Sequence, residues 1–266
     1  MLCLNKVRVC YARKRRLMVM NESLFNVIQK EEGRRATFEV LEYKQLPVTS
    51  AGSSSSYYAK ETGISLKQVR ITLRQGAVQA EAGALQFMKG DLGLKSNAGG
   101  VGGFMKKMAS NILTEESLFK PLYEGTGEIY LEPSYGHYLL LNLNDEEVVA
   151  DRGMFYAAEP SVQLGVARQK LTSSIKGEDG LFQTRLRGSG FCVLQSPVPL
   201  QQIMKIQLRD EKLQVDGNFA LLRKGDIDFS VKRASSSIIG SATSGEGYLH
   251  VFEGTGEVWI APTLGR

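Results

Sequence analysis

Three acidic residues at matching places along the chain are the first candidates for chemistry. Glu81, Asp151 and Asp216 each end a short apolar stretch and stand one or two positions before a glycine. If three related units placed these carboxylates around one axis, they could bind a hard cation such as calcium or magnesium through oxygen ligands. Acids that simply terminate polar strand ends would look the same. We favour this plainer interpretation, predict no cofactor and no metal, and keep the three acids as the candidate ligands if a metal binds.

The histidines and the remaining acids give no catalytic arrangement. His137 and His250 occupy non-equivalent positions, so nothing brings them together as a metal site or a catalytic triad. Glu128 and Glu257 match each other, but Phe191 stands at the corresponding place between them, which argues against a symmetric acid–base pair. We therefore predict no catalytic residues.

The glycine motifs fit no known catalytic or phosphate-binding pattern. Gly188-Ser189-Gly190 lacks the G-x-S-x-G spacing of a nucleophile elbow, and its counterparts carry threonine, which indicates a backbone role. The glycines at 99, 100, 102 and 103 match neither a dinucleotide-binding loop nor a P-loop. The sequence therefore favours a protein that is not an enzyme.

Charge gives no strong reason to expect a nucleic-acid partner. The net charge of +5 comes from residues 1–20, which hold six basic residues and no acid, and leave 27 basic against 28 acidic residues elsewhere. Lys89-Gly90-Asp91 recurs as Lys224-Gly225-Asp226, but Glu159-Pro160-Ser161 interrupts the series, so a regular basic ring is not expected.

A glycine pair with strand-like flanks occurs three times. Tyr123–Pro133 contains Glu-Gly-Thr-Gly-Glu, Phe252–Pro262 repeats it, and Leu186–Pro197 is a degenerate copy with Gly-Ser-Gly. The first glycines are 63 and 66 residues apart, the period of a repeated structural unit. The glycines predict a bulge or a close backbone approach before the next strand.

A second landmark precedes each glycine pair. An apolar stretch, three polar residues and a second apolar stretch lead to the acid and glycine named above, with the polar residues at 74–76, 144–146 and 209–211. Alternation of apolar and polar residues predicts strands, and the polar residues predict tight hairpin turns between them. The repeat-defining glycines are Gly83, Gly153 and Gly217, with the pairs Gly125/Gly127, Gly188/Gly190 and Gly254/Gly256.

These landmarks predict an all-β fold of three repeated β-sandwich or barrel-like units in a pseudo-threefold arrangement. We expect a basic extension at 1–20, with a mis-assigned start, a targeting peptide or a basic arm as the open alternatives. Residues 21–33 form the first polar, helix-like stretch. The predicted boundaries are 21–68 for an N-terminal segment joining the sheet, 69–136 for repeat 1, 137–201 for repeat 2 and 202–266 for repeat 3.

The first unit carries an insert at 97–113. Its glycines predict a flexible connection, followed by a short helix that places Phe104, Met105, Met108 and Ile112 as candidate contacts to a protein groove or a membrane surface. A helix that caps the protein's own sandwich is the alternative interpretation. Cys192 stands alone in the body and is expected to be buried, in a reducing compartment.

Several of these features together resemble one family. Ala82-Gly83-Ala84, Lys89-Gly90-Asp91, the glycine-rich insert, Glu116-Ser117-Leu118-Phe119 and the repeated Gly-x-Gly-Glu are similar to the mitochondrial-biogenesis family known for altered inheritance of mitochondria, member twenty-four of that series. The likeness covers residues 38–264. It implies a triplicated sandwich that resembles a double-stranded β-helix, with a fold similar to that of the tryptophan RNA-binding attenuation protein. Eukaryotic members are associated with mitochondrial membrane organisation, and bacterial members are largely uncharacterised, so no catalytic residues carry over.

From these observations we expect a soluble, cytoplasmic interaction or scaffold protein that forms homo-oligomers, because repeated β-units leave sheet edges that invite pairing. Two alternatives stay open. The first is a regulator that binds a small molecule or RNA, by analogy with the fold. The second is a membrane-associated organiser acting through residues 99–113.

Overall fold

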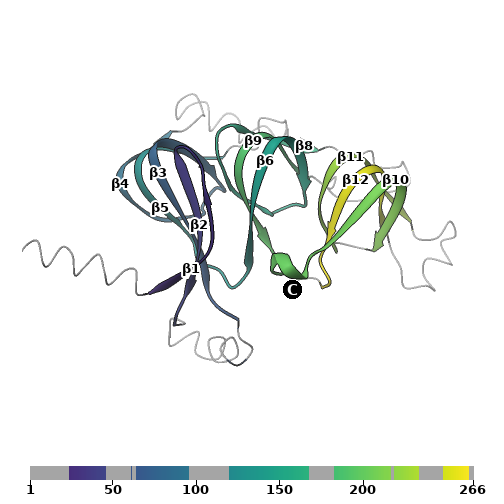
Figure 1. Ribbon diagram of the computed structural model, residues 1–266, viewed down its shortest axis with the longest axis horizontal. Helices are drawn as coiled ribbons and strands as arrows, with labels where there is room; N and C mark the ends of the chain where they lie inside the picture. Colours follow the sequence, from purple (N-terminus) through teal and green to yellow (C-terminus); the bar gives the residue numbers. More distant parts are fainter. Residues whose placement is uncertain are drawn as a thin grey trace, which may run out of the picture.

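The protein is an all-β chain whose strands share one antiparallel sheet (Figure 1). The computed structural model describes residues 24–45, 61, 64–95, 120–167, 183–216, 219–233 and 248–263. The strands are β1 Phe25–Glu32, β2 Ala36–Tyr43, β3 Lys67–Ala80, β4 Leu85–Lys95, β5 Leu122–Leu131, β6 His137–Ala150, β7 Phe155–Ala158, β8 Val162–Ala167, β9 Gln183–Ser196, β10 Met204–Asp216, β11 Ala220–Arg233 and β12 Tyr248–Ile260, with one 3-10 turn at Leu200–Gln202.

Three stretches of the chain pair their strands in the same way. In the first segment (67–131), β5 pairs with both β3 and β4. In the second segment (137–196), β9 pairs with β6 on one side and with β7 and β8 on the other. In the third segment (204–260), β12 pairs with both β10 and β11.

The three segments lie in a row and share the sheet (Figure 1). The end of β3 pairs with β7, and the end of β6 pairs with β11. The main path of strands is open, from β1 at one end to β10 at the other. The sequence predicted three β-sandwich units in a pseudo-threefold arrangement; the described strands instead form a continuous, open sheet. Pairing between segments satisfies backbone groups that separate sandwiches would leave at their edges.

The N-terminal hairpin joins this sheet as an addition to the first segment. Strands β1 and β2 pair with each other, and β2 pairs with the first half of β3. The helix-like interpretation of residues 21–33 was wrong, because Phe25–Glu32 is a strand. Pairing with β2 decides its conformation, since a short polar stretch has little helical stability of its own.

The prediction of hairpin turns at the three polar stretches was also wrong. β3, β6 and β10 each continue through the polar residues as a single strand, with a register shift between Leu73 and Gly76, Asn144 and Glu146, and Arg209 and Glu211. These shifts are β-bulges, in which one strand holds an extra residue. The middle residue has positive φ in all three, at Gln75, Asp145 and Asp210. Bulges and turns both favour polar residues that tolerate this conformation, so the composition alone did not distinguish them.

Buried side chains form three clusters, and two of them cross a segment boundary. The first segment shares its core with Tyr156 and Ala157 of the second. The core of the second segment includes Leu222 and Trp259 of the third. The segments are therefore held together by apolar packing as well as by strand pairing. In the described residues no helix is long and apolar enough to cross a membrane.

Candidate functional site

The glycine pairs lie opposite the bulges and close them with a side-chain hydroxyl. The backbone N–H of Gln75 donates to Oγ1 of Thr126 at 3.0 Å, and that of Asp210 donates to Oγ1 of Thr255 at 3.0 Å. In the second segment the N–H of Asp145 donates to Oγ of Ser189 at 2.9 Å. The residue between each pair of glycines therefore has a structural role: its hydroxyl satisfies the backbone group that the bulge leaves unpaired.

The first glycine of each pair allows two backbones to approach closely. A Cβ at Gly125 would lie 2.1 Å from the carbonyl oxygen of Asp91, and one at Gly254 would lie 2.3 Å from that of Asp226. The prediction of a close approach is therefore supported at these positions. Its location before a strand was wrong, because Gly125 lies in the middle of β5.

The second glycine of each Gly-Thr-Gly pair also allows two backbones to approach closely, and it too lies within a strand and not before one. A Cβ at Gly127 would lie 2.3 Å from the carbonyl oxygen of Lys89, and one at Gly256 would lie 2.1 Å from that of Lys224. Gly127 was expected to precede a strand but lies inside β5, and Gly256 lies inside β12. Both strands run on through the glycines because each pairs with a neighbour on either side along this stretch.

The degenerate pair of the second segment behaves alike. A Cβ at Gly188 would lie 2.5 Å from the carbonyl oxygen of Ser161, and one at Gly190 would lie 2.6 Å from the Ser161 hydroxyl. These two glycines also lie inside a strand, β9, and not before one. In all three segments, the space that a side chain would need is thus occupied by a neighbouring stretch of the same chain.

Two of the three candidate metal ligands begin tight turns. The carbonyl of Glu81 accepts from the N–H of Ala84 at 3.1 Å, and the carbonyl of Asp151 accepts from the N–H of Met154 at 3.3 Å. The glycine at the third position of each turn, Gly83 or Gly153, has φ of +81°, which suits a type II turn.

The side chains of these acids have different surroundings. The Glu81 carboxylate accepts a hydrogen bond from Nζ of Lys120. Burial raises the pKa of Asp151, while a hydrogen bond from the backbone of Arg152 and the charge of His250 act in the opposite direction. Asp216 is exposed. Within the described ranges, no three histidine, cysteine or acidic side chains lie together as a metal site would require.

A cavity of about 660 Å³ lies where the second and third segments meet. The turn at Asp151 and Arg152 forms one part of its wall, and Leu221 of β11 forms another. His137, at the start of β6, also lines it. A smaller cavity of about 270 Å³ occupies the corresponding place between the first and second segments, beside the turn at Glu81. The same turn therefore borders a cavity at both boundaries.

The larger cavity is lined by a histidine, an acidic residue and a basic residue. Burial lowers the pKa of His137, and the nearby charge of Lys67 lowers it further, so the imidazole is largely neutral at pH 7. Asp151 and Arg152, neighbours in the sequence, add an acidic and a basic residue to the lining. This lining can form hydrogen bonds to a small polar molecule.

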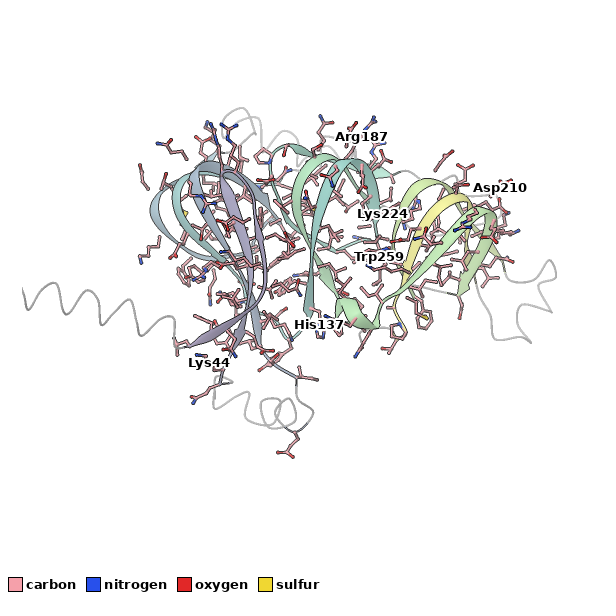
Figure 2. All side chains as sticks on the ribbon, in the orientation of Figure 1. Lys44, His137, Arg187, Asp210, Lys224 and Trp259 are labelled. Carbon is pink, nitrogen blue, oxygen red and sulfur yellow. The ribbon has the colours of Figure 1, made fainter. Side chains whose placement is uncertain are left out.

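A second polar cluster surrounds Trp259 at the same boundary (Figure 2). Nζ of Lys205 lies 4.2 Å and Nζ of Lys224 lies 5.4 Å from the centre of the indole ring, distances typical of cation–π contacts. Glu257 accepts hydrogen bonds from the indole Nε1 and from Nε2 of Gln207. The ammonium of Lys224 and the carboxylate of Glu257 thus have partners within the third segment.

The remaining candidates have structural surroundings. The imidazole of His250 packs edge-on against Phe229 at 5.2 Å, and burial lowers its pKa. Glu159, which interrupts the Lys-Gly-Asp series, accepts from the N–H of Phe191 at 2.9 Å. Cys192 is buried, and burial raises the pKa of its thiol to about 12. Residues 1–20, the predicted insert with Phe104, Met105, Met108 and Ile112, and Gly217 lie outside the described residues.

Sequence reasoning missed both cavities. Their lining comes from turns and strand ends of adjoining segments, and only the pairing between segments brings these together. An acid followed two residues later by glycine, as at Asp151 and Gly153, marks the turn in the sequence. It does not say which strand lies against it.

Comparisons with known proteins agree with the fold. A crystal structure of the protein SPYM3_0169 from Streptococcus pyogenes is similar with a TM-score of 0.56 and 24% identity, over 75% of this chain and 89% of that one. An uncharacterized protein of Streptococcus pyogenes serotype M6 is 25% identical over 171 residues, which are 63% of this chain and 67% of the relative. The family described as Mitochondrial biogenesis AIM24 matches residues 58–263. That match spans most of the chain and includes all three segments, so the protein belongs to the mitochondrial biogenesis AIM24 family.

Proposed function

We propose that the protein is a non-enzymatic scaffold that associates with further copies of itself through the free edges of its sheet. The observation that carries this proposal is the open path of strands. β10 pairs only with β12, and β4 pairs only with β5, among the described residues. Unpaired strand edges present rows of N–H and C=O groups that readily pair with another chain.

The surface of β4 supports this proposal. Phe87, Met88 and Leu94 are 47%, 41% and 57% exposed. Large apolar side chains gathered on an edge strand are typical of an interaction surface, because water contact there is unfavourable.

We further propose that the three segments are copies of one unit. Each has the same strand pairing, a bulge with positive φ, and a glycine pair whose central hydroxyl closes that bulge. Three units that each bury a face against the next form a scaffold whose terminal units retain unburied faces.

A non-enzymatic role agrees with the partners of the acidic side chains. Glu81 is paired with Lys120, and Glu257 accepts from Trp259 and Gln207. These contacts give the carboxylates a structural use. A reducing, cytoplasmic location suits the unpaired thiol of Cys192.

The oligomeric state tests the proposal directly. Light scattering coupled to gel filtration should return masses that are multiples of the 29.3 kDa chain and that rise with concentration. A mass of one chain over about a hundredfold range of concentration would overturn it.

The larger cavity favours a second candidate function, a regulator that binds a small molecule. The 660 Å³ volume is in the range of ligand pockets, and His137, Asp151 and Arg152 supply polar groups. A thermal-shift screen of small polar metabolites tests this idea. A compound that stabilises the protein but not its Arg152→Ala variant supports it, and a screen without stabilising compounds contradicts it.

A further inference from the structure

The two boundaries between segments are built in the same way. At the first boundary, the N–H of Glu81 donates to the carbonyl of Tyr156 at 2.8 Å, and Ala80 lies opposite Ala157. At the second, the N–H of Asp151 donates to the carbonyl of Leu221 at 2.8 Å. Each boundary therefore joins the end of one segment's first strand to the start of the next segment's second strand.

The second boundary repeats the register of the first. Ala150 lies opposite Leu222, and Val149 lies opposite Arg223. The acceptor of the boundary hydrogen bond is in each case five residues after its own segment's acid: Tyr156 follows Asp151, and Leu221 follows Asp216. This five-residue spacing relates positions within one segment, so it also identifies the corresponding positions at the strand ends that do not lie at a boundary.

Two complementary strand ends are left without this pairing. The end of β10, at Asp216, corresponds to the donor side of a boundary. The start of β4, with Gln86 five residues after Glu81, corresponds to the acceptor side. Among the described residues, β12 is the strand paired with β10, and β5 is the strand paired with β4.

Burial distinguishes the free start of β4 from its two counterparts. At the boundaries, Ala157 is 0% exposed and Leu222 is 3% exposed. The corresponding Phe87 is 47% exposed and stacks on Tyr130, with ring centres 4.4 Å apart. This position is buried at both boundaries, where a neighbouring segment pairs with the strand. At the start of β4, where no described strand pairs on that side, the same position holds an exposed aromatic side chain.

The free end of β10 shows a smaller difference in the same direction. Ala80 and Ala150, which face the boundaries, are 0% exposed, and the corresponding Val215 is 7% exposed. The N–H groups of Glu81 and Asp151 point away from their own segment's third strand. By the same alternation along the strand, the N–H of Asp216 points away from β12.

We propose that the end of β10 in one copy of this chain pairs antiparallel with the start of β4 in a second copy, with Val215 opposite Phe87 and the N–H of Asp216 donating to the carbonyl of Gln86. This inference rests on the self-association proposed above and specifies its geometry. The contact joins two different surfaces, so each added copy leaves one free edge of each kind. Association of this type continues until a ring closes or a filament forms.

Cysteine cross-linking tests the register. Val215 and Phe87 would form a non-hydrogen-bonded pair, with Cα atoms about 4.5 Å apart, which suits a disulfide. The two variants are Phe87→Cys and Val215→Cys, made separately in full-length chains in which Cys3 and Cys10 are replaced by serine. Cys192 can stay, because its thiol is buried.

The matched control is Lys212→Cys, an exposed position three residues before Val215 on the same strand. On mild oxidation, a mixture of Phe87→Cys and Val215→Cys should give about tenfold more disulfide-linked dimer than Phe87→Cys mixed with Lys212→Cys. Equal yields in the two mixtures would overturn the proposed register.

A proline variant provides a second measurement that does not depend on disulfide chemistry. Asp216→Pro removes the N–H that would donate across the contact, on an edge where proline is tolerated. Loss of one hydrogen bond should weaken self-association by up to about tenfold. Lys212→Pro, at the same edge outside the paired register, should leave it unchanged. Equal association by both variants would contradict the inference.

The two proposals fail in different ways. If light scattering finds multimers but neither cross-linking nor Asp216→Pro distinguishes the proposed pair from its control, self-association stands and this geometry is wrong. If the wild-type chain is monomeric throughout, the self-association proposal fails, and the pairing fails with it.

Discussion

Adding one methyl group at Gly125 should destabilise the protein more than adding it at Gly83. Both glycines have positive φ, +130° and +81°, so alanine is conformationally strained at either position. They differ in their surroundings. A Cβ at Gly125 would lie 2.1 Å from the carbonyl oxygen of Asp91 and 3.2 Å from Cα of Leu92, whereas one at Gly83 would meet nothing within 4 Å. Gly83→Ala is therefore the control, because it keeps a positive φ without the close contact.

The expected difference follows from these two contributions. A sparsely populated positive φ costs alanine about 1–3 kcal/mol in either variant. Forcing apart two paired backbones adds about 1–3 kcal/mol at Gly125 alone, as for other overpacked sites. The backbone oxygen of Asp91 cannot rotate away as a side chain could, and β4 would have to move.

Urea denaturation of the wild type and both variants measures this difference in the free energy of unfolding. We expect Gly125→Ala to lose about 1–3 kcal/mol more than Gly83→Ala, and its melting temperature to fall by a further ~2–4 °C for each kcal/mol. Equal losses in the two variants would refute the reasoning, because the glycine pair would then be needed only for its backbone conformation.

Two other predictions concern the bulge and the buried histidine. Thr255→Val should lower the free energy of unfolding by about 0.5–1 kcal/mol, because it removes the acceptor for the N–H of Asp210, and Thr255→Ser should retain it; equal stability of the valine and serine variants in urea would contradict this role. Burial lowers the pKa of His250 below its usual 6.5, although the charges of Asp151 and Asp216 oppose the shift, so the unfolded chain binds a proton before the folded chain does. Stability should therefore be complete above about pH 6.5 and decrease as the pH falls through the folded pKa, and His250→Gln should flatten this decrease in thermal melts; an unchanged slope would show that another group is responsible.

The prediction of family and strand-rich character came from local patterns. Period-two alternation and the spaced glycine pairs predicted an all-β chain, and the residues matched to the family include all three glycine pairs. The exchange of threonine for serine between the glycines correctly indicated a backbone role, since both residues offer a hydroxyl at the same place. These are properties of one strand and its immediate neighbours.

The bulges show where local pattern fails. Asn144-Asp145-Glu146 reads as a hairpin turn, but β6 continues through it, and the extra residue is accommodated by β9. The conformation depends on whether the next apolar stretch folds back or goes on to pair with the same partner. That choice is made by residues some forty positions away.

The glycine pairs show the same limit. Their small size indicated a close approach, yet Gly127 and Gly256 were expected ahead of a strand and lie within one. Whether a glycine starts a strand or sits inside it depends on how far the neighbouring strands extend. For Gly127 these neighbours are β3 and β4, and for Gly256 they are β10 and β11.

The sequence by itself determined that the chain forms strands and that glycine pairs recur at nearly equal intervals. The tertiary structure decided which strand ends meet, and therefore where the cavities lie and which edges stay free. The physical reason is that a strand's backbone groups are satisfied by a partner distant in sequence, so the pairing depends on long-range packing, as the contact between Asp151 and Leu221 shows.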